Sequence, residues 1–341
     1  MPGPHPAVAA ARVAVRRALL AAGLHEEALV LVACSGGADS LTLAAATAFV
    51  APRLGLRAGA VVVDHGLQEG SDRVAADAAE RCRELGLDPV EVVPAVVAQT
   101  SEGPEADART ARYAVLRARA DHHGAAAVLL GHTLDDQAEQ VLLGLVRGSG
   151  ARSLSGMPQA RQLAPGTLLL RPLLGLGREQ TLEACAALGL EPWEDPHNED
   201  PRYTRVRVRR ALADLDADLG PGVRQALARS AELLRDDAHA LDEATRAAYR
   251  DLGEQPWAVG RLRELPRAVR TRLWRAAALA SGSPGTDLTA AHLRAVDTLV
   301  THWRGQGPLH LPGGVRAGRG PEGVWVGSGD TDRRPTGHNG S

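Results

Sequence analysis

The chain has 341 residues, more than one ordinary hydrophobic core requires, so two domains are expected. Hydrophobic residues make up 44% and charged residues 23% of the sequence, a globular composition that excludes disorder for most of the chain. All 39 basic residues are Arg, because the sequence contains no Lys. This absence excludes Schiff-base chemistry and nucleotide-binding loops of the Walker type, which hold phosphate with a lysine.

The net charge of −2 hides an uneven distribution of charge along the chain. Residues 1–200 contain 17 Arg and 25 acidic residues, a net charge of −8, whereas residues 201–341 contain 22 Arg and 16 acidic residues, a net charge of +6. We interpret this as an acidic part that handles a metal-bound or cationic ligand and a basic part that faces a polyanion. Uneven surface composition explains the same numbers, so charge alone does not decide the function.

Cysteine use and hydropathy predict a reduced, cytoplasmic setting and no membrane partner. Cys34, Cys82 and Cys185 form no Cys-x-x-Cys pair, which argues against a disulfide scaffold or a structural zinc site. No uninterrupted apolar run approaches the roughly 18 residues that a membrane span needs. The pair His122-His123 has no evident metal-binding partner and is predicted to be a surface turn.

The first half of the chain alternates apolar strands with helices. Strands are predicted at Ala28–Cys34, Ala58–Asp64, Pro89–Val93 and Ala126–Leu130. Helices are predicted at 41–50, Ser71–Leu85 and Glu105–His122, and again after the fourth strand. This alternation predicts an α/β fold, a Rossmann-like parallel sheet that helices cover on both faces.

From about Asp214 the pattern changes to helices. They are predicted at Val223–Tyr249, Leu265–Ala280 and Leu288–Trp303, followed by short strands in Leu309–Val326. We therefore predict a nucleotide-binding domain over residues 1–215, a smaller, mainly helical domain over residues 216–327, and a disordered tail over residues 328–341.

Polar residues follow three of the predicted strands, at Ser35–Ser40, Asp64–His65 and Gly131–Asp136. Ligands of parallel sheets bind at the carboxyl ends of the strands, so we expect these segments to converge. The first of them has the residues of a phosphate-binding loop: Ser35, Gly36, Gly37, Ala38, Asp39 and Ser40. Its glycines expose backbone N–H groups at a helix N-terminus, and Asp39 is placed to hold Mg²⁺ on a phosphate. The alternative is a strand–helix turn capped by Ser.

This loop resembles the PP-loop, SGGxDS, of the ATP pyrophosphatase superfamily, whose members cleave ATP to AMP and pyrophosphate. Within that superfamily, further motifs resemble the tRNA(Ile)-lysidine synthetase family. They are Val63–Leu67 (VDHGL), Glu105–Tyr113 (EADARTARY), Gly131–Glu139 (GHTLDDQAE), Arg147–Gly150 (RGSG), Arg171–Leu174 (RPLL) and Trp193–Asp200 (WEDPHNED), followed by Tyr203 and alternating arginines. The sequence departs from the family pattern at Gln68, where Arg is usual, and at Val206, where Asn is usual.

The resemblance implies a ligase that uses ATP, Mg²⁺ and free L-lysine to convert the wobble cytidine of an isoleucine tRNA with a CAU anticodon to lysidine. It implies ATP binding by the loop together with Asp64 and His65. The catalytic residues that we expect are Asp39, Arg112, His132, Asp136 and Glu139. The oligomeric state is not predicted.

His132, Asp135, Asp136 and Glu139 lie three and four residues apart at the start of the helix after the fourth strand. Their carboxylates suit the ammonium groups of lysine, or the proton that the attacking amine must lose. The alternative is an acidic first turn that complements the helix dipole.

Two sets of arginines are candidates for phosphate contacts. Arg109 and Arg112 lie one helical turn apart and suit a triphosphate or an RNA backbone, unless they belong to a solvated helix face. A second set lies within nine residues that contain no acid, and it is predicted to bind tRNA: Arg202, Arg205, Arg207, Arg209 and Arg210. The competing interpretation is that this set pairs with acids of the first domain.

Two other functions remain as alternatives. One is a tRNA thiolase with the same PP-loop, although such enzymes generally carry cysteine pairs that this chain lacks. The other is a non-catalytic ATP-binding module, which would not need the acidic helix start, the arginine run and a second domain together.

Overall fold

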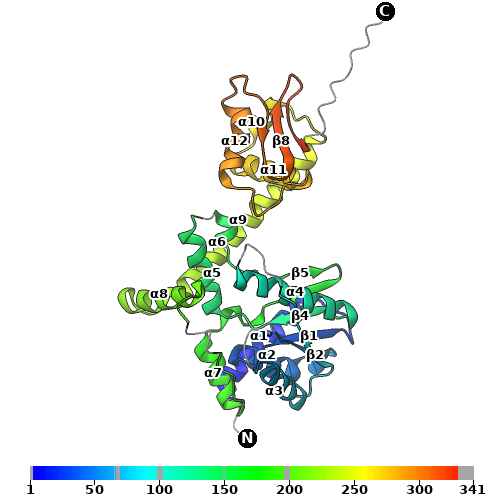
Figure 1. The fold of residues 1–341 in the computed structure, drawn as a ribbon, viewed down its shortest axis with the longest axis vertical. Helices are drawn as coiled ribbons and strands as arrows, with labels where there is room; N and C mark the ends of the chain where they lie inside the picture. The colour runs from blue at the N-terminus through cyan, green and yellow to red at the C-terminus, as the bar shows by residue number, and fades with distance from the viewer. Residues whose placement is uncertain are drawn as a thin grey trace, which may run out of the picture. The chain divides into compact units, whose positions relative to one another are not determined.

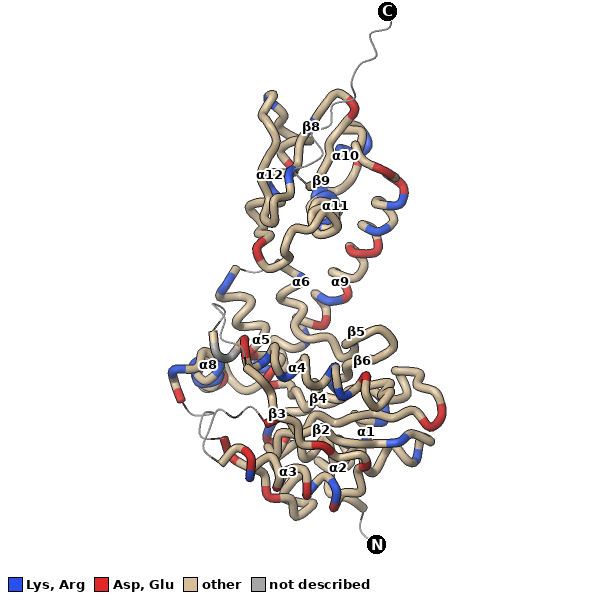
Figure 2. Tube along the Cα trace, turned by 45° about the vertical axis from the view of Figure 1, so that its right-hand side comes forward, with Lys and Arg blue, Asp and Glu red and all other residues tan. Residues whose placement is uncertain are grey.

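The computed structural model describes residues 3–64, 66, 70–97, 103–148, 150–195 and 200–328. The chain forms two compact units, Met1–Leu234 (unit 1) and Arg235–Ser341 (unit 2), which divide inside the long helix α9 (Val223–Leu252). Arg and acidic residues follow one another along this helix (Figure 2). The part of the predicted disordered tail from residue 329 on lies outside the described residues.

Unit 1 is an α/β structure (Figure 1). In chain order its elements are α1 (Pro6–Ala22), β1 (Leu29–Cys34), α2 (Ala38–Val50), β2 (Arg57–Asp64), α3 (Ser71–Glu84), β3 (Val90–Pro94), α4 (Pro104–His122), β4 (Ala127–Leu130), α5 (Leu134–Val146), α6 (Ala151–Leu154), β5 (Ala160–Ala164), β6 (Thr167–Leu170), α7 (Arg178–Ala187) and α8 (Thr204–Leu219), with short 3-10 helices at Pro52–Leu54 and Pro172–Gly175. The four strands predicted in the first half, and the helices between them, are confirmed.

The six strands of unit 1 form one sheet in the order β3-β2-β1-β4-β6-β5. All neighbouring pairs are parallel except β5 with β6, so the predicted parallel sheet is confirmed. The antiparallel edge was not predicted, because β5 is mostly exposed and lacks an apolar run. The chain builds outward from β1 in both directions, which makes the β1–β4 boundary a switch point where ligands of such sheets bind.

Alternate residues of the strands pack on opposite faces of the sheet. On β1, Val30 and Val32 join the core formed with α1, α2 and α3, whereas Leu29 and Leu31 join the core formed with α4. Both faces are therefore buried, which explains why the strands are nearly continuous apolar runs.

Unit 2 combines helices with a small antiparallel sheet. Its elements after α9 are α10 (Val259–Glu264), α11 (Arg267–Ala280), α12 (Ala290–Thr301), β7 (Leu309–His310), a 3-10 helix at Pro312–Gly314, β8 (Val315–Arg319) and β9 (Val324–Ser328), with sheet order β7-β8-β9. Trp257 and Trp274 are almost fully buried in its core. The predicted helices and short strands are confirmed. No helix in the described part of either unit is long and apolar enough to cross a membrane.

Candidate active site

The predicted phosphate loop connects β1 to α2. Gly36 has a φ of 83°, a left-handed conformation that glycine adopts without steric strain, and Gly37 is the N-cap of α2. The hydroxyl of Ser40 donates to the carbonyl of Gly37 (2.9 Å) and accepts from the backbone N–H of Ser35 (3.1 Å). The loop is therefore held in shape by its own serines, at a helix N-terminus whose partial positive charge suits a phosphate.

The segment after β4 lies directly against this loop. A Cβ atom on Gly131 would lie 3.1 Å from the carbonyl carbon and oxygen of Asp39 and 3.2 Å from the nitrogen of Ser40. From the segment after α7, the N–H of Trp193 donates to the carbonyl of Gly36 (3.0 Å). The predicted convergence of the loops after β1 and β4 is confirmed, and Gly131 allows their close approach.

The third predicted segment follows β2. The carboxylate of Asp64 accepts a hydrogen bond from the N–H of Gly66 (2.9 Å), which turns the chain at the end of the strand. His65, predicted to bind ATP, lies outside the described residues. The roles of Asp64 and His65 toward ATP stay predictions.

The carboxylate of Asp39, in the first turn of α2, contacts α7. The hydroxyl of Thr181 donates to its Oδ1, and Nη2 of Arg178 lies 3.5 Å from its Oδ2. Burial raises the pKa of Asp39, and the nearby carboxylates of Asp136 and Asp135 add to this rise. The hydrogen bond from Thr181 and the charge of Arg178 act in the opposite direction. Carboxylate oxygens are the ligands that Mg²⁺ prefers, so Asp39, beside the phosphate loop, would hold the ion here.

His132 is the second residue after β4, and its ring is neutral. Nε of Arg171 donates to its Nδ1 (3.2 Å), and since a guanidinium cannot accept, the ring carries its proton on Nε2. Burial lowers the pKa of His132 to about 3; Asp136 acts against this shift, and the positive charge of Arg171 acts with it. A neutral ring donates a hydrogen bond but supplies no positive charge at pH 7.

The two aspartates at the start of α5 have different partners. Asp136 forms a capping box with Thr133, whose N–H (2.8 Å) and hydroxyl (3.2 Å) both donate to its Oδ2. Asp135 accepts from the N–H of Arg178 (2.8 Å) and lies 3.2 Å from Nε of Arg224 on α9. The helix-capping alternative therefore holds for Asp136, and its part in lysine binding stays a prediction.

Glu139, one turn further along α5, faces the arginine run on α8. Its side chain is only 1% exposed, with Nε of Arg209 3.0 Å from Oε1 and Nη1 of Arg205 3.9 Å from Oε2. Burial raises the pKa of Glu139, and the charge of Arg209 opposes that rise. Two arginines predicted to bind tRNA thus pair with an acid of the same unit, as the competing interpretation expects.

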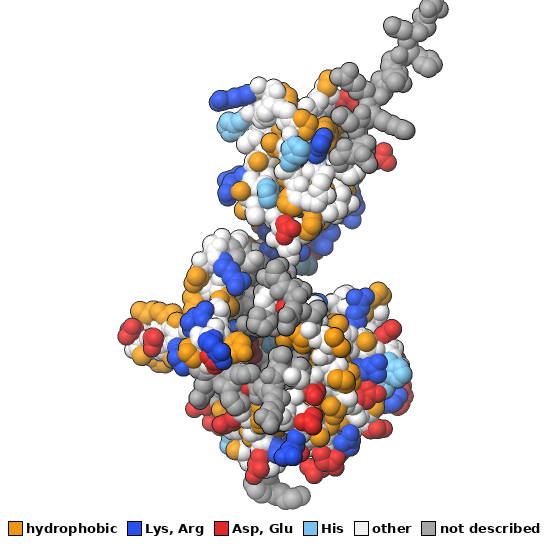
Figure 3. Space-filling view, viewed as in Figure 1, with side chains coloured by type: hydrophobic (Ala, Val, Ile, Leu, Met, Phe, Trp, Pro, Cys, Tyr) orange, Lys and Arg blue, Asp and Glu red, His pale blue; other side chains and the backbone are white. Residues whose placement is uncertain are grey.

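The other three predicted tRNA contacts, Arg202, Arg207 and Arg210, are exposed. Arg202 forms an ion pair with Asp200 (2.7 Å), and Arg207 donates to the carbonyls of Pro201 (2.7 Å) and Arg202 (3.0 Å). Figure 3 shows Arg side chains gathered over α8, where a polyanion has access to them. Contact of any of these residues with tRNA stays a prediction.

Arg171 connects several parts of the site, and the sequence did not assign it a role. It is 3% exposed, follows β6, and donates to His132, to the carbonyl of Pro158 (2.9 Å) and to the hydroxyl of Tyr113 (3.5 Å). The sequence could have indicated Arg171 in the same way as the other strand ends, because it is a polar residue directly after an apolar strand. Trp193 begins a motif of the family resemblance but has no predicted role, and Arg178 and Thr181 carry no sequence signal, because only the fold brings α7 to the loop.

Two further features lie away from the strand ends. Nε2 of His123 is 3.0 Å from the carboxylate of Glu91 on β3, and their ligand atoms and that of His122 lie within 4.8 Å of one another. The prediction that the histidine pair has no metal-type partner is therefore wrong, because Glu91 comes from a distant strand. Arg119, 3.6 Å from the same carboxylate, already balances its charge.

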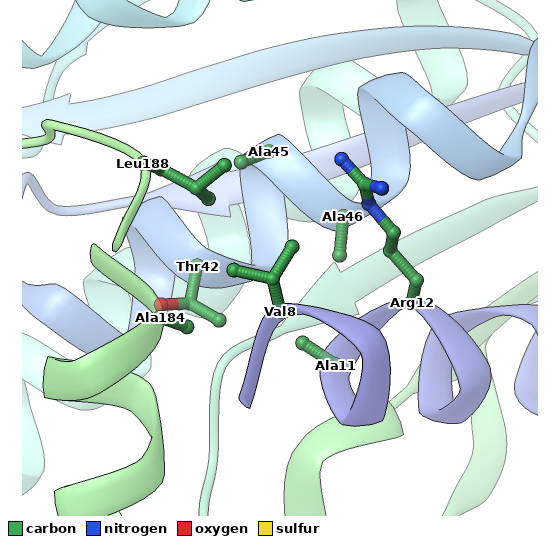
Figure 4. A pocket seen from close by; sticks show the side chains of 8 residues that line it. All are labelled: Val8, Ala11, Arg12, Thr42, Ala45, Ala46, Ala184 and Leu188. Atoms are coloured by element: carbon green, nitrogen blue, oxygen red, sulfur yellow. The ribbon is translucent and has the colours of Figure 1, made fainter. Parts of the chain in front are cut away.

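A cavity of about 10 Å³, room for one water molecule, lies between α1, α2 and α7 (Figure 4). Side chains of Val8, Ala45 and Leu188 are among its mostly apolar lining. It is a gap in core packing, and the candidate active site remains the sheet edge.

The fold and the loop define the chain as a PP-loop protein. The family model described as the PP-loop domain matches residues 11–215, which contain the loops after β1 and β4. A second model, described as the TilS substrate binding domain, matches residues 258–320 of unit 2.

Curated relatives cover nearly the whole chain. The tRNA(Ile)-lysidine synthase of Thermobifida fusca is 57% identical over 333 residues, which cover 97% of this chain and 100% of the relative. That of Streptomyces coelicolor is 53% identical over 344 residues, covering 93% of this chain and 97% of the relative. The chain therefore belongs to the tRNA(Ile)-lysidine synthase family.

A solved structure shares the fold at lower identity. The U34-tRNA thiolase NcsA of Methanococcus maripaludis, with its [4Fe-4S] cluster, superposes with a TM-score of 0.57 at 20% identity, covering 67% of this chain and 80% of the thiolase. This similarity confirms the architecture of the sheet and its helices and does not extend to the reaction.

Proposed function

We propose that this protein ligates free L-lysine to C2 of the wobble cytidine in an isoleucine tRNA with a CAU anticodon, using ATP and Mg²⁺ in a cytoplasmic setting. The observation that carries the proposal is the meeting of the PP-loop and the acidic start of α5 at one sheet edge, in a chain of this family. A phosphate site and carboxylates for a cationic amino acid then lie side by side.

The proposed reaction has two steps. The O2 atom of cytidine attacks the α-phosphorus of ATP, and the bond to the bridging oxygen breaks to release pyrophosphate. The lysine side-chain amine, having lost a proton, then attacks C2, and the C2–O2 bond breaks to release AMP. Mg²⁺, when bound, supplies positive charge that offsets the charge developing on the phosphates.

The residues of this chain would bind phosphate, donate a hydrogen bond or take up a proton, according to their protonation states. Backbone N–H groups of the loop hold the phosphates, and Asp39 positions the metal-bound phosphate. Because His132 is neutral, its part is to donate a hydrogen bond from Nε2. Burial raises the pKa of Glu139, which favours uptake of a proton by this carboxylate, and the charge of Arg209 restrains that rise.

The test is pyrophosphate release measured with each substrate omitted in turn. We expect release only with tRNA present, and transfer of radiolabelled lysine to RNA only when ATP, tRNA and lysine are all present. An otherwise identical tRNA with U in place of the wobble C is the control, because uridine presents the wrong group at C4 for the modified base. Lysine transfer to that control, or release without tRNA, would contradict the proposal.

The thiolase alternative is less well supported by the residues. Cys34, Cys82 and Cys185 are all buried free thiols, whereas a sulfur relay needs thiols that a partner can reach. Sulfur incorporation into tRNA in place of lysine would favour that alternative.

A further inference from the structure

Four arginines surround one tyrosine ring in unit 1. The guanidinium carbons of Arg109, Arg161 and Arg112 lie 5.1, 5.2 and 5.9 Å from the ring centroid of Tyr113. Arg109 and Arg171 both donate to its hydroxyl, at 3.3 and 3.5 Å. We refer to these five residues as the Tyr113 cluster.

The described side chains give the positive charge of the cluster little compensation. Among the residues whose side chains the structure describes, no Asp or Glu lies within 4.0 Å of any of its four guanidinium groups, and Nε of Arg112 is buried without a hydrogen-bond partner. Burial lowers the pKa of Arg112 and of Arg171, and the charge of Arg109 lowers both further. Like charges gathered in a partly buried site repel one another, so an anion bound among them would stabilise the cluster.

The Tyr113 cluster extends from the active site, where Arg171 donates to His132, outward to Arg161 on β5. Arg161 pairs with Leu169 in the β5–β6 ladder, near the carboxyl end of β6, so the cluster lies at the same edge of the sheet as the loop. In the strand order, β5 is three strands from β1, roughly 14 Å at about 4.8 Å per strand. Arg161 is exposed and Arg171 is 3% exposed, so the cluster reaches from solvent to the buried site.

These positions favour a polymer over a mononucleotide as the ligand. The phosphates of ATP are anchored at the PP-loop, whereas an RNA strand that brings one base to that loop carries phosphates on to the outer strands. A phosphodiester offers two non-bridging oxygens that share one negative charge, and they match the paired N–H groups of a guanidinium. We propose that the Tyr113 cluster binds a backbone phosphate of the RNA, close to the nucleotide that reacts. The proposal rests on the proposed function, because it requires an RNA substrate.

The test uses Arg161→Gln and Arg109→Gln, with Arg117→Gln as the matched control. Arg117 is an exposed arginine of the same helix, α4, outside the cluster. We expect each cluster variant to weaken tRNA binding and to lower the slope of log affinity against log salt by about 1, as one lost phosphate contact does. Affinity for ATP without tRNA, and the slope of Arg117→Gln, should match the unmodified protein.

Three results would overturn the proposal. A loss of ATP affinity equal to the loss of tRNA affinity would assign the cluster to the triphosphate. Unchanged tRNA affinity and salt slope would show that it binds no RNA phosphate. A large fall in melting temperature with an unchanged slope would show that it stabilises the fold. If the unmodified protein binds no tRNA, the proposed function itself fails, which separates the two hypotheses.

Discussion

The buried charged side chains of the Arg270–Asp297 pair in unit 2 have more complete hydrogen-bond and ion-pair partners than those of the candidate active site in unit 1. In unit 2, Nε and Nη2 of Arg270 bond both oxygens of Asp297 (2.7 and 3.0 Å), and the indole N–H of Trp274 donates to the same carboxylate (3.1 Å). Burial acts to raise the pKa of Asp297, but these donors outweigh it and hold the pKa below its ordinary value. A buried charge whose partners are complete stabilises the fold.

In unit 1 the buried charges are matched less completely. The pKa values of Asp39 and Glu139 are raised and that of Arg112 is lowered, so burial outweighs the partners that the chain provides. Within the described residues, Oε2 of Glu139 and Nε of Arg112 are buried without hydrogen bonds. This difference indicates where function lies. Buried charged groups that the chain itself does not fully pair mark places where a ligand can supply the remaining charge.

Removing one member of the complete pair should have the largest effect. Asp297→Asn leaves Arg270 buried without its counter-charge, and we expect unit 2 to lose about 3–5 kcal/mol of unfolding free energy. Urea unfolding followed by tryptophan fluorescence measures this, because four of the five tryptophans lie in unit 2. ATP-dependent pyrophosphate release, scored below the unfolding transition, should keep its rate.

The matched control for that variant is Asp251→Asn. Asp251 pairs with Arg261 in the same unit, but its side chain is 78% exposed, so we expect a loss below about 1 kcal/mol. The pKa of Asp297 is lower in the folded than in the unfolded protein. Its contribution to the unfolding free energy is therefore fully present above about pH 4, and it is lost as the pH falls through the folded pKa. Equal losses in the two variants would contradict the comparison.

Asp39→Asn tests the incomplete site. We expect pyrophosphate release to fall roughly 100-fold, as when one group that stabilises developing charge is lost, while the melting temperature changes little. Thr181→Val is the control, because it removes the hydrogen bond to Asp39 and keeps the carboxylate. Near-normal release by Asp39→Asn would remove Asp39 from the catalytic residues.

The fold was largely predictable because its information is local. Each central strand is a continuous apolar run such as Leu29–Cys34, and each polar strand end stands beside it in the sequence. The β5–β6 edge was missed because an exposed strand such as Ala160–Ala164 has no local apolar pattern and exists by pairing with Thr167–Leu170.

Partners within the site were less predictable, because they come from distant segments. The arginine run contains no acid in its own nine residues, so it was interpreted as an RNA surface, yet Arg209 meets Glu139 of α5. In the same way, Thr181 reaches Asp39 only after the fold places α7 beside α2. Sequence reasoning identifies which groups are charged, and the fold decides which of them are neutralised.

His132 provides a pH-dependent test of burial in unit 1. Its folded pKa of about 3 lies below the unfolded value of about 6.5, so the unfolded state takes up the proton first. Stability is therefore fully present above about pH 6.5 and decreases toward pH 3, by at most about 1.4 kcal/mol per pH unit. We expect His132→Gln to flatten this dependence in urea titrations, whereas His239→Gln, on the exposed part of α9, leaves it unchanged. The same pH dependence in both variants would show that folding does not lower the pKa of His132.

The smallest expected effect divides the arginine run itself. Arg207 is exposed, so Arg207→Gln should lower the salt slope of tRNA binding by about 1 and leave ATP affinity unchanged. Arg209→Gln should leave the slope unchanged and lower the melting temperature, because the buried carboxylate of Glu139 loses its nearest cation.

The double variant Arg209→Gln with Glu139→Gln separates pairing from RNA contact. Removing both charges should recover part of the lost melting temperature, since no buried carboxylate remains unpaired. If Arg209→Gln instead lowers the salt slope as much as Arg207→Gln and keeps its melting temperature, then Arg209 leaves Glu139 to bind RNA. The Arg209–Glu139 ion pair would then be one that RNA can open, whereas the Arg270–Asp297 ion pair of unit 2 serves only the stability of the fold.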